Sequence, residues 1–147
     1  MQTKNDVKIL VDYLNFTIGV DCFVESVENP DYEDETQQGI LDLICLVFGL
    51  DDLEFTYKRG FNGYEDAWSK DGITICAGGC DTIMVQMSGK GCRLYETINK
   101  SLDWMDLIKL VQGFRRHNFS RLDIACDTFD FLRMDKLMRY TLQQRYV

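Results

Sequence analysis

Apolar side chains recur along the first third of the chain in two different periods. Residues 10–18 form a β-rich alternating run, which predicts a strand. Its two faces would carry Leu14, Phe16 and Ile18 on one side and Val11, Tyr13 and Asn15 on the other. Residues 36–48 instead show apolar positions at helical spacing and end at Gly49, so we expect a helix there.

Four short β-like runs come next, at residues 55–58, 64–69, 73–77 and 82–87. The segments between them are rich in glycine, asparagine and aspartate, the residues that tight turns favour. An antiparallel meander is the simplest arrangement for such a pattern.

The remaining pattern alternates between helix and strand. We expect helices at residues 93–99 and 102–114, the second capped by Ser101, then a strand at 119–126 and a last helix at 134–144. The order β-α-ββββ-α-α-β-α predicts an α+β fold, with a largely antiparallel sheet and helices packed on one face. With 147 residues, the chain has the size of a single domain, residues 1–147.

Charge is distributed unevenly along the chain, and this distribution limits the classes of function that the protein can have. The net charge is −8, and residues 1–60 hold four Lys or Arg against thirteen Asp or Glu. Only residues 101–147 are slightly basic, with eight against six. This charge balance counts against a protein that simply binds DNA through a broad basic surface, because the backbone phosphates attract basic surfaces. No apolar run reaches the ~20 residues of a membrane span and no signal peptide is apparent, so we expect a cytoplasmic protein without membrane contact.

Cysteine and histidine usage disfavours several kinds of site. Cys76 and Cys80 resemble half of a zinc site, but no second pair exists and His117 is the only histidine. A paired-histidine metal site is excluded for the same reason. The six cysteines are expected to be reduced thiols, most of them in apolar surroundings.

Residues 121–127 carry the most suggestive charges. On a strand, Arg121, Asp123 and Asp127 would share one face, while Leu122 and Ile124 would face the core. Two interpretations remain open, a ligand or metal site and an exposed Arg–Asp pair. Asp123 and Asp127 would be about 13 Å apart on an ideal strand, too far for one ion unless the strand bends.

The segment from Ser88 to Arg93 reads Ser-Gly-Lys-Gly-Cys-Arg, between a predicted strand and a predicted helix. Glycines at a helix N-terminus allow backbone N–H groups to converge on an anion, to which Lys90 and Arg93 would add charge. A plain strand-to-helix turn explains the segment equally well. The segment does not satisfy the pattern of a Walker A loop, because Met84 and Gly91 stand at two of its fixed positions.

Four segments, in order, resemble the replication initiation factor (Rep_trans) family of rolling-circle plasmids and related conjugative relaxases. They are Val11-Asp12-Tyr13-Leu14, Phe61-Asn62-Gly63-Tyr64, the run from Met87 to Glu96, and the run from Phe119 to Asp127. The last two are the specific ones, because they are similar to a family signature of the form SGxGCR followed by an acid and to a strand of the form TRLDLAxDD. The resemblance covers nearly the whole chain and about the first half of a family member.

The resemblance implies a site. Family members nick one DNA strand through a catalytic tyrosine, with acidic residues and a divalent metal; they act as dimers and recruit a host helicase. Carried over, Glu96, Asp123 and Asp127 would hold Mg²⁺ or Mn²⁺, and Arg121 would steer phosphate beside them. The basic residues expected to contact DNA or RNA are Lys90, Arg93, Arg115 and Arg116.

The family's nucleophile lies in a second half that we do not find in this chain. Tyr140 and Tyr146 do not stand in its sequence context. We therefore expect an initiator-derived nucleic-acid-processing domain that is incomplete for nicking, with weak metal-dependent nuclease activity as its residual chemistry. A homodimer is consistent with this expectation.

The acidic surface keeps a second function open. A mobile element can reuse such a domain as an anti-defence inhibitor of the anti-CRISPR type, which binds a basic host nuclease or its guide complex. The residues expected to act in that case are the acids of segment 31–35, together with Asp51, Asp52 and Glu54.

Overall fold

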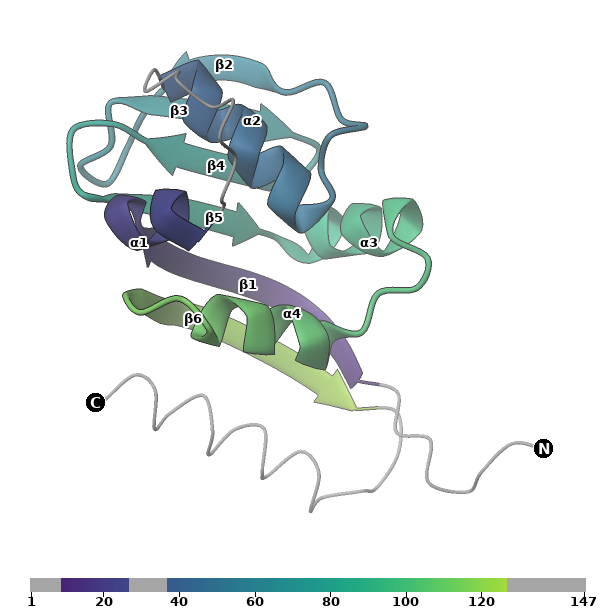
Figure 1. Cartoon of the computed structure of the whole chain (residues 1–147). Coiled ribbons are helices and arrows are strands. Elements are labelled where there is room, and N and C mark those ends of the chain that lie inside the picture. The colour runs from purple at the N-terminus through teal and green to yellow at the C-terminus, as the bar shows by residue number, and fades with distance from the viewer. Residues whose placement is uncertain (1–8, 27–36, 127–147) are drawn as a thin grey trace.

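A computed structural model describes residues 9–26 and 37–126 of the chain. Its centre is a six-stranded sheet in the order β2-β3-β4-β5-β1-β6 (Figure 1). The strands are β1 (Ile9–Gly19), β2 (Thr56–Arg59), β3 (Asp66–Lys70), β4 (Ile73–Ala77), β5 (Thr82–Met87) and β6 (His117–Cys126). Every neighbouring pair is antiparallel, which confirms the predicted meander and places β1 between β5 and β6.

Four helices lie on one face of this sheet (Figure 1). They are α1 (Val20–Ser26), α2 (Gln37–Phe48), α3 (Gly89–Ile98) and α4 (Trp104–Gln112). The predicted α+β class is thus confirmed. The sequence pattern does not predict α1. The helix α3 is predicted, but it begins four residues before the expected start. The predicted last helix at 134–144 and the acidic segment 31–35 lie outside the described residues. In the described ranges, no helix has the length and apolarity needed to cross a membrane.

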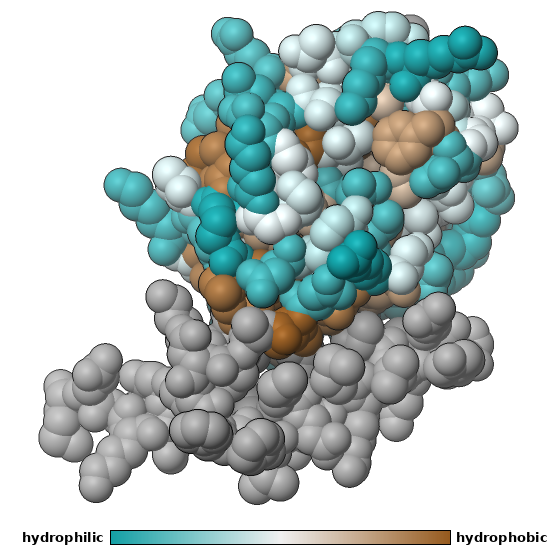
Figure 2. Space-filling view, turned by 180° about the vertical axis from the view of Figure 1, so that it is seen from behind, coloured by the Kyte–Doolittle hydropathy of each residue, from teal (hydrophilic) through white to brown (hydrophobic). Residues whose placement is uncertain are grey.

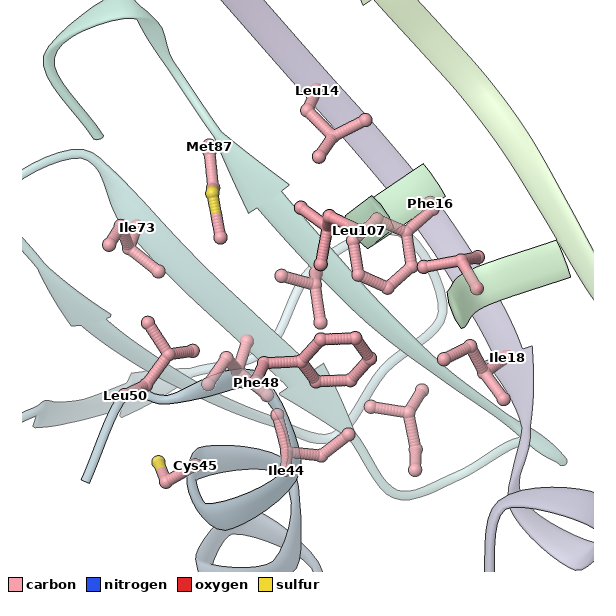
Figure 3. Packing of buried hydrophobic residues seen from close by; sticks show 14 of the residues in the cluster. Leu14, Phe16, Ile18, Ile44, Cys45, Phe48, Leu50, Ile73, Met87 and Leu107 are labelled. Atoms are coloured by element: carbon pink, nitrogen blue, oxygen red, sulfur yellow. The ribbon is translucent and has the colours of Figure 1, made fainter. Parts of the chain in front are cut away.

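The core fills the space between these helices and the sheet (Figure 3). Leu14, Phe16 and Ile18 point from β1 into it, as the alternating pattern predicts, and each is at most 1% exposed. From α2, Ile44 and Phe48 meet them, and the rings of Phe16 and Phe48 lie 5.5 Å apart. This packing fixes which face of every strand is covered and which is left open.

Val11 is a correction to the predicted strand faces. The alternating pattern places it with Tyr13 and Asn15, but it is fully buried in the core with Leu14. The cause is a shift in register between β1 and β6 at Asp12, which leaves an extra residue on β1. The bulge reverses the alternation, so Val11 turns inward and Asp12 is exposed.

The cap of α4 is a second correction. The sequence pattern predicts Ser101 as the cap of this helix, but α4 begins at Trp104 and its N-cap is Asp103. The carboxylate of Asp103 accepts the backbone N–H of Met105 at 2.9 Å. An aspartate in this position both satisfies a free N–H group and interacts favourably with the helix dipole.

Candidate functional site

The sheet face opposite the helices presents a continuous row of polar side chains. Cross-strand pairing aligns one residue from each strand, running from β2 to β6 as Thr56, Ser69, Thr74, Gln86, Asn15 and Arg121. Among the described residues no helix covers this face, which we call the open face. Figure 2, turned by 180° from Figure 1, looks onto the open face and shows mostly hydrophilic and neutral side chains. Thr74 is buried within this row, and the other five side chains are at least partly exposed.

Arg121 and Asp123 mark the β6 end of the open face. The Arg121 guanidinium donates to the Asp123 carboxylate at 2.7 Å and lies 4.0 Å above the ring of Tyr13. This pairing lowers the pKa of Asp123 below its usual value. The predicted exposed pair is therefore present, and the guanidinium is held against an aromatic ring with 56% of its side chain exposed.

The amides of Asn15 and Gln86 adjoin this stack. The Asn15 Nδ2 group donates to Gln86 Oε1 at 3.5 Å, while the buried Asn15 Oδ1 has no hydrogen-bond partner in the described part of the chain. Both side chains are partly buried, so their orientations are restrained. They add hydrogen-bond donors and acceptors beside the Arg121 guanidinium, and such groups can recognise a polar planar group.

The Ser-Gly-Lys-Gly-Cys-Arg segment builds the start of α3. Ser88 is the N-cap and accepts the backbone N–H of Gly91 at 3.4 Å. Gly91 packs directly on the turn at Gly72, where a Cβ on either glycine would overlap backbone atoms of the other. The backbone N–H of Ser88 donates to the Gly72 carbonyl at 2.9 Å. The packing of this strand-to-helix turn on the β3–β4 turn therefore accounts for Gly91 and Gly72.

Arg93 and Glu96 are tied to neighbouring elements. Arg93 donates to the carbonyl oxygen of Val11 and pairs with Asp12 at 3.4 Å, on the β1 bulge. Glu96 pairs with Arg93 at 2.8 Å and accepts the indole N–H of Trp104 at 2.9 Å. Because Trp104 packs in the core, Glu96 lies on the helix-covered side of the sheet.

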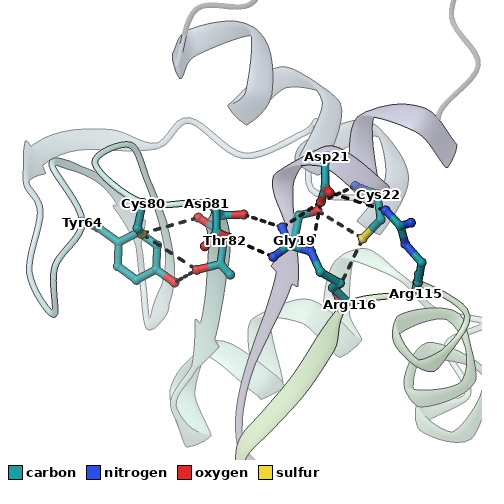
Figure 4. Close-up of polar contacts among 9 residues, drawn as sticks. All are labelled: Gly19, Asp21, Cys22, Tyr64, Cys80, Asp81, Thr82, Arg115 and Arg116. Carbon is teal, nitrogen blue, oxygen red and sulfur yellow. Dashed lines mark hydrogen bonds and ion pairs between the residues drawn. The ribbon is translucent and has the colours of Figure 1, made fainter.

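Arg115 and Arg116 lie near Gly19, at the C-terminal end of β1 (Figure 4). The helix α3 contacts the other end of β1, through Arg93. Arg116 bridges Asp21 at 2.7 Å and Asp81 at 2.9 Å, and Arg115 reaches Asp21 at 3.4 Å. Arg116 is the main cause of the lowered pKa of Asp21, together with the backbone N–H of Cys22. These predicted nucleic-acid contacts are thus ion-paired, and they join the ends of β1, β5 and β6.

The structure does not bring the predicted metal ligands together. Asp123 lies on the open face and Glu96 on the helix-covered side, and each is paired with an arginine. Asp127 lies outside the described residues. Within residues 9–26 and 37–126 no group of three or more His, Cys, Asp or Glu side chains is placed to hold a metal. Glu96 and Asp123 therefore do not fit one shared ion.

Lys90 is the least constrained of the predicted contacts. Its side chain is 75% exposed, and its ammonium lies 3.7 Å from Asp71. The sequence interpretation does not identify three residues of the open face as site residues, namely Tyr13, Asn15 and Gln86. The alternation along β1 and β5 contains the signal for them, because it places polar and aromatic side chains opposite the core residues.

Comparison with known proteins gives one family. The family model described as "Rolling Circle replication initiation protein N-terminal domain" matches residues 34–110, just over half of the chain. No curated protein and no solved structure matches the chain. The match runs from just before α2 into α4, so it includes the meander and α3 but neither β1 nor β6.

Proposed function

The chain belongs to the family of rolling-circle replication initiation protein N-terminal domains, and we propose that it binds single-stranded DNA on the open face of its sheet. The observation that supports this proposal is the Arg121 guanidinium stacked on Tyr13 at the exposed β6 end of the face. The family match supports a replication-initiator-like domain, and initiation exposes single strands. We expect single strands to bind along the polar row of the open face, rather than on a basic patch.

Unpaired bases are the part of DNA that this surface fits best. Bases stack on aromatic rings and on guanidinium planes, and such a contact is worth about 1–3 kcal/mol per base. The amides of Asn15 and Gln86 are partly buried beside the stack and can hydrogen-bond base edges. The Arg121 side chain is 56% exposed, so a guanidinium with one face on Tyr13 can present the other face to a base.

Phosphate contacts should be few. Among the described residues the open face carries one arginine, Arg121, and one lysine, Lys58, which lies at the other edge of the sheet on β2. Each phosphate neutralised on a single strand contributes about 0.7 to the slope of log K against log salt. We therefore expect a shallow slope of about 1, in contrast to a protein that grips DNA through a basic surface.

Fluorescence anisotropy with a labelled oligothymidine tests the proposal. Arg121→Ala should weaken binding about tenfold, because both the stack and the phosphate contact are lost. Arg115→Ala is the matched control, since Arg115 is exposed but paired with Asp21 at another corner of the molecule. Equal affinities of the two variants, or tighter binding of duplex than of single-stranded DNA, would contradict the proposal. Oligouridine in parallel separates DNA from RNA.

Nicking is not part of this proposal. No tyrosine of the chain stands in the sequence context of the family's nucleophile, so we expect no covalent phosphotyrosyl adduct with supercoiled plasmid. An adduct that persists on a denaturing gel and disappears in Tyr140→Phe or Tyr146→Phe would contradict this. Because Glu96 and Asp123 do not share a site, we assign no step to a divalent metal.

The anti-defence inhibitor remains a second candidate, favoured by the acidic surface. Asp51, Asp52 and Glu54 follow α2, are exposed and make no ion pair with another described residue. Such acids attract a basic partner and raise its association rate. If neutralising the acids of segment 31–35 abolishes inhibition of a guided nuclease without changing the melting curve, this function is supported. An unchanged inhibition would remove it.

A further inference from the structure

A hollow of about 490 Å³ opens on the helix-covered face, between α2 and the β2–β3 hairpin. Its lining includes Leu41 and Leu46 of α2, Phe55 just before β2, Tyr57 of β2 and Trp68 of β3. A hollow of this volume is large enough to take a large side chain of a partner. The hollow is separate from the open face, so a role for it does not depend on DNA binding there.

The walls of the hollow carry the most exposed large apolar side chains of the described residues. Leu46 is 62% exposed and Tyr57 is 59% exposed. Tyr57 is also fixed in place, because its hydroxyl donates to Asp66 at 2.6 Å and its ring meets that of Trp68 edge-on. Apolar groups held rigidly in contact with water mark an interaction surface, since covering them with another apolar side chain is favourable.

The rim of the hollow is acidic. Asp42 and Asp51 line it, and neither makes an ion pair with a described residue, although Asp42 accepts a hydrogen bond from Gln38 at 3.1 Å. Burial raises the pKa of the neighbouring Cys45 thiol to about 11, and the two carboxylates add to this rise. The hollow therefore lies in a negative field, which favours a cationic partner group.

We propose that this hollow docks a segment of a partner protein that inserts one large apolar side chain and sets a lysine or arginine beside it, against Asp42 and Asp51. The residues that precede α2 in the chain are an unsuitable occupant. Segment 28–35 contains five acidic residues and no basic one, so it would be repelled by the rim. Among the described strands, β2 beside the hollow is an edge strand of the sheet.

The test uses the full chain and a fluorescein-labelled peptide with a central Trp-Leu pair between two Lys-Arg pairs. Binding is measured by anisotropy. Leu46→Arg should weaken binding at least about tenfold, because it blocks the apolar wall and adds a repelling charge. Asp51→Asn should weaken it about threefold, and this loss should disappear at high salt.

Matched controls come from α4. Leu110→Arg changes another exposed leucine, and Asp106→Asn another exposed acid, both outside the hollow. Neither should change the affinity by more than about twofold, and all four variants should keep the melting temperature of the wild type, because the changed side chains are exposed.

Several results would overturn the proposal. They are equal weakening by Leu46→Arg and Leu110→Arg, equal binding of a peptide with Ala-Ala in place of Trp-Leu, and no binding at about 1 mM peptide. A wild-type dimer in sedimentation velocity that Leu46→Arg converts to a monomer would also overturn it, since the occupant would then be a second copy of this chain.

Discussion

The four arginines from which the sequence predicts contacts to nucleic acid or phosphate are each paired with a carboxylate. They are Arg93, Arg115, Arg116 and Arg121. Three of these arginines connect elements that are distant in the sequence, as when Arg116 reaches Asp21 and Asp81. Arg121 differs, because its partner Asp123 is two residues away and its guanidinium also lies on Tyr13. Because Arg121 connects no distant elements, a ligand can bind it with the smallest loss of folding stability among these four arginines.

The Arg116 bridge should be visible in the pH dependence of stability. The lowered pKa of Asp21 means that its contribution is present above the unfolded pKa near 3.8 and is lost as the pH falls through the lower folded value. We expect Arg116→Ala to melt below the wild type at pH 6, and the difference to shrink below pH 3.8. Calorimetry across this range measures it. A difference that stays constant with pH would show that packing of the arginine, and not its charge, matters.

Glu96 offers a prediction that separates a packing role from a metal role. Glu96→Leu leaves the buried indole N–H of Trp104 without its acceptor, so it should destabilise by about 1–3 kcal/mol. Glu96→Gln keeps an acceptor oxygen and should cost about 1 kcal/mol or less. Urea unfolding measures both. If the two variants are equally stable while Mn²⁺ stabilises only the wild type, Glu96 is a metal ligand instead.

At the scale of elements, α3 is positioned by backbone contact with the β3–β4 turn. Gly91→Ala would improve helix propensity, but its Cβ would overlap the Gly72 carbonyl. We expect the overlap to prevail, with a loss of about 2 kcal/mol in urea unfolding. Gly89→Ala is the control, because its Cβ would lie 3.3 Å from the Asp12 carbonyl and need only a small adjustment. A neutral Gly91→Ala would mean that α3 can move away from the turn.

The start of α4 can be tested by comparing its two candidate N-cap residues, Asp103 and Ser101. Removing the observed cap by Asp103→Ala should destabilise by about 1 kcal/mol, whereas Ser101→Ala should be nearly neutral. Thermal melting of the two variants side by side decides between them. The reverse order would mean that α4 begins at Ser101, as its sequence pattern suggests.

For the whole molecule, the sheet separates the two proposed surfaces. The hollow adjoins β2 on the helix-covered face, and Arg121 lies on β6 on the open face. Six strands at about 4.8 Å spacing place these edges about 24 Å apart. We expect labelled peptide and oligothymidine to bind independently. Leu46→Arg should leave DNA affinity within about twofold, and Arg121→Ala should do the same for the peptide.

Competition between the two probes would contradict this independence. It would require either that one probe uses both surfaces or that the sheet transmits a change between its edges. Anisotropy of each labelled probe, with the other unlabelled and in excess, distinguishes independence from competition directly.

The sequence by itself determined the class of fold and the antiparallel meander at its centre. Alternation predicted β1, helical spacing predicted α2, and β-like runs between turn residues predicted the four strands from β2 to β5. Helices near α3 and α4 and a strand near β6 were expected as well. The motif around Ser88 also indicated the family that the match over residues 34–110 shows, whereas the motif around Arg121 lies outside that match. The exposed Arg121–Asp123 pair could also be predicted from the sequence, since side chains two residues apart on a strand lie on the same face of the sheet.

Only the tertiary structure decided the rest, because those features depend on groups far apart in the chain. The bulge at Asp12 reverses the faces of β1 through its pairing with β6, and no local pattern shows this. Glu96 and Asp123 are both acidic and both belong to family-like motifs, yet the sheet lies between them. Likewise, Leu46 and Tyr57 are ordinary apolar residues in sequence. They line one hollow because the fold places α2 beside β2 and β3, and that is a property of packing rather than of either segment.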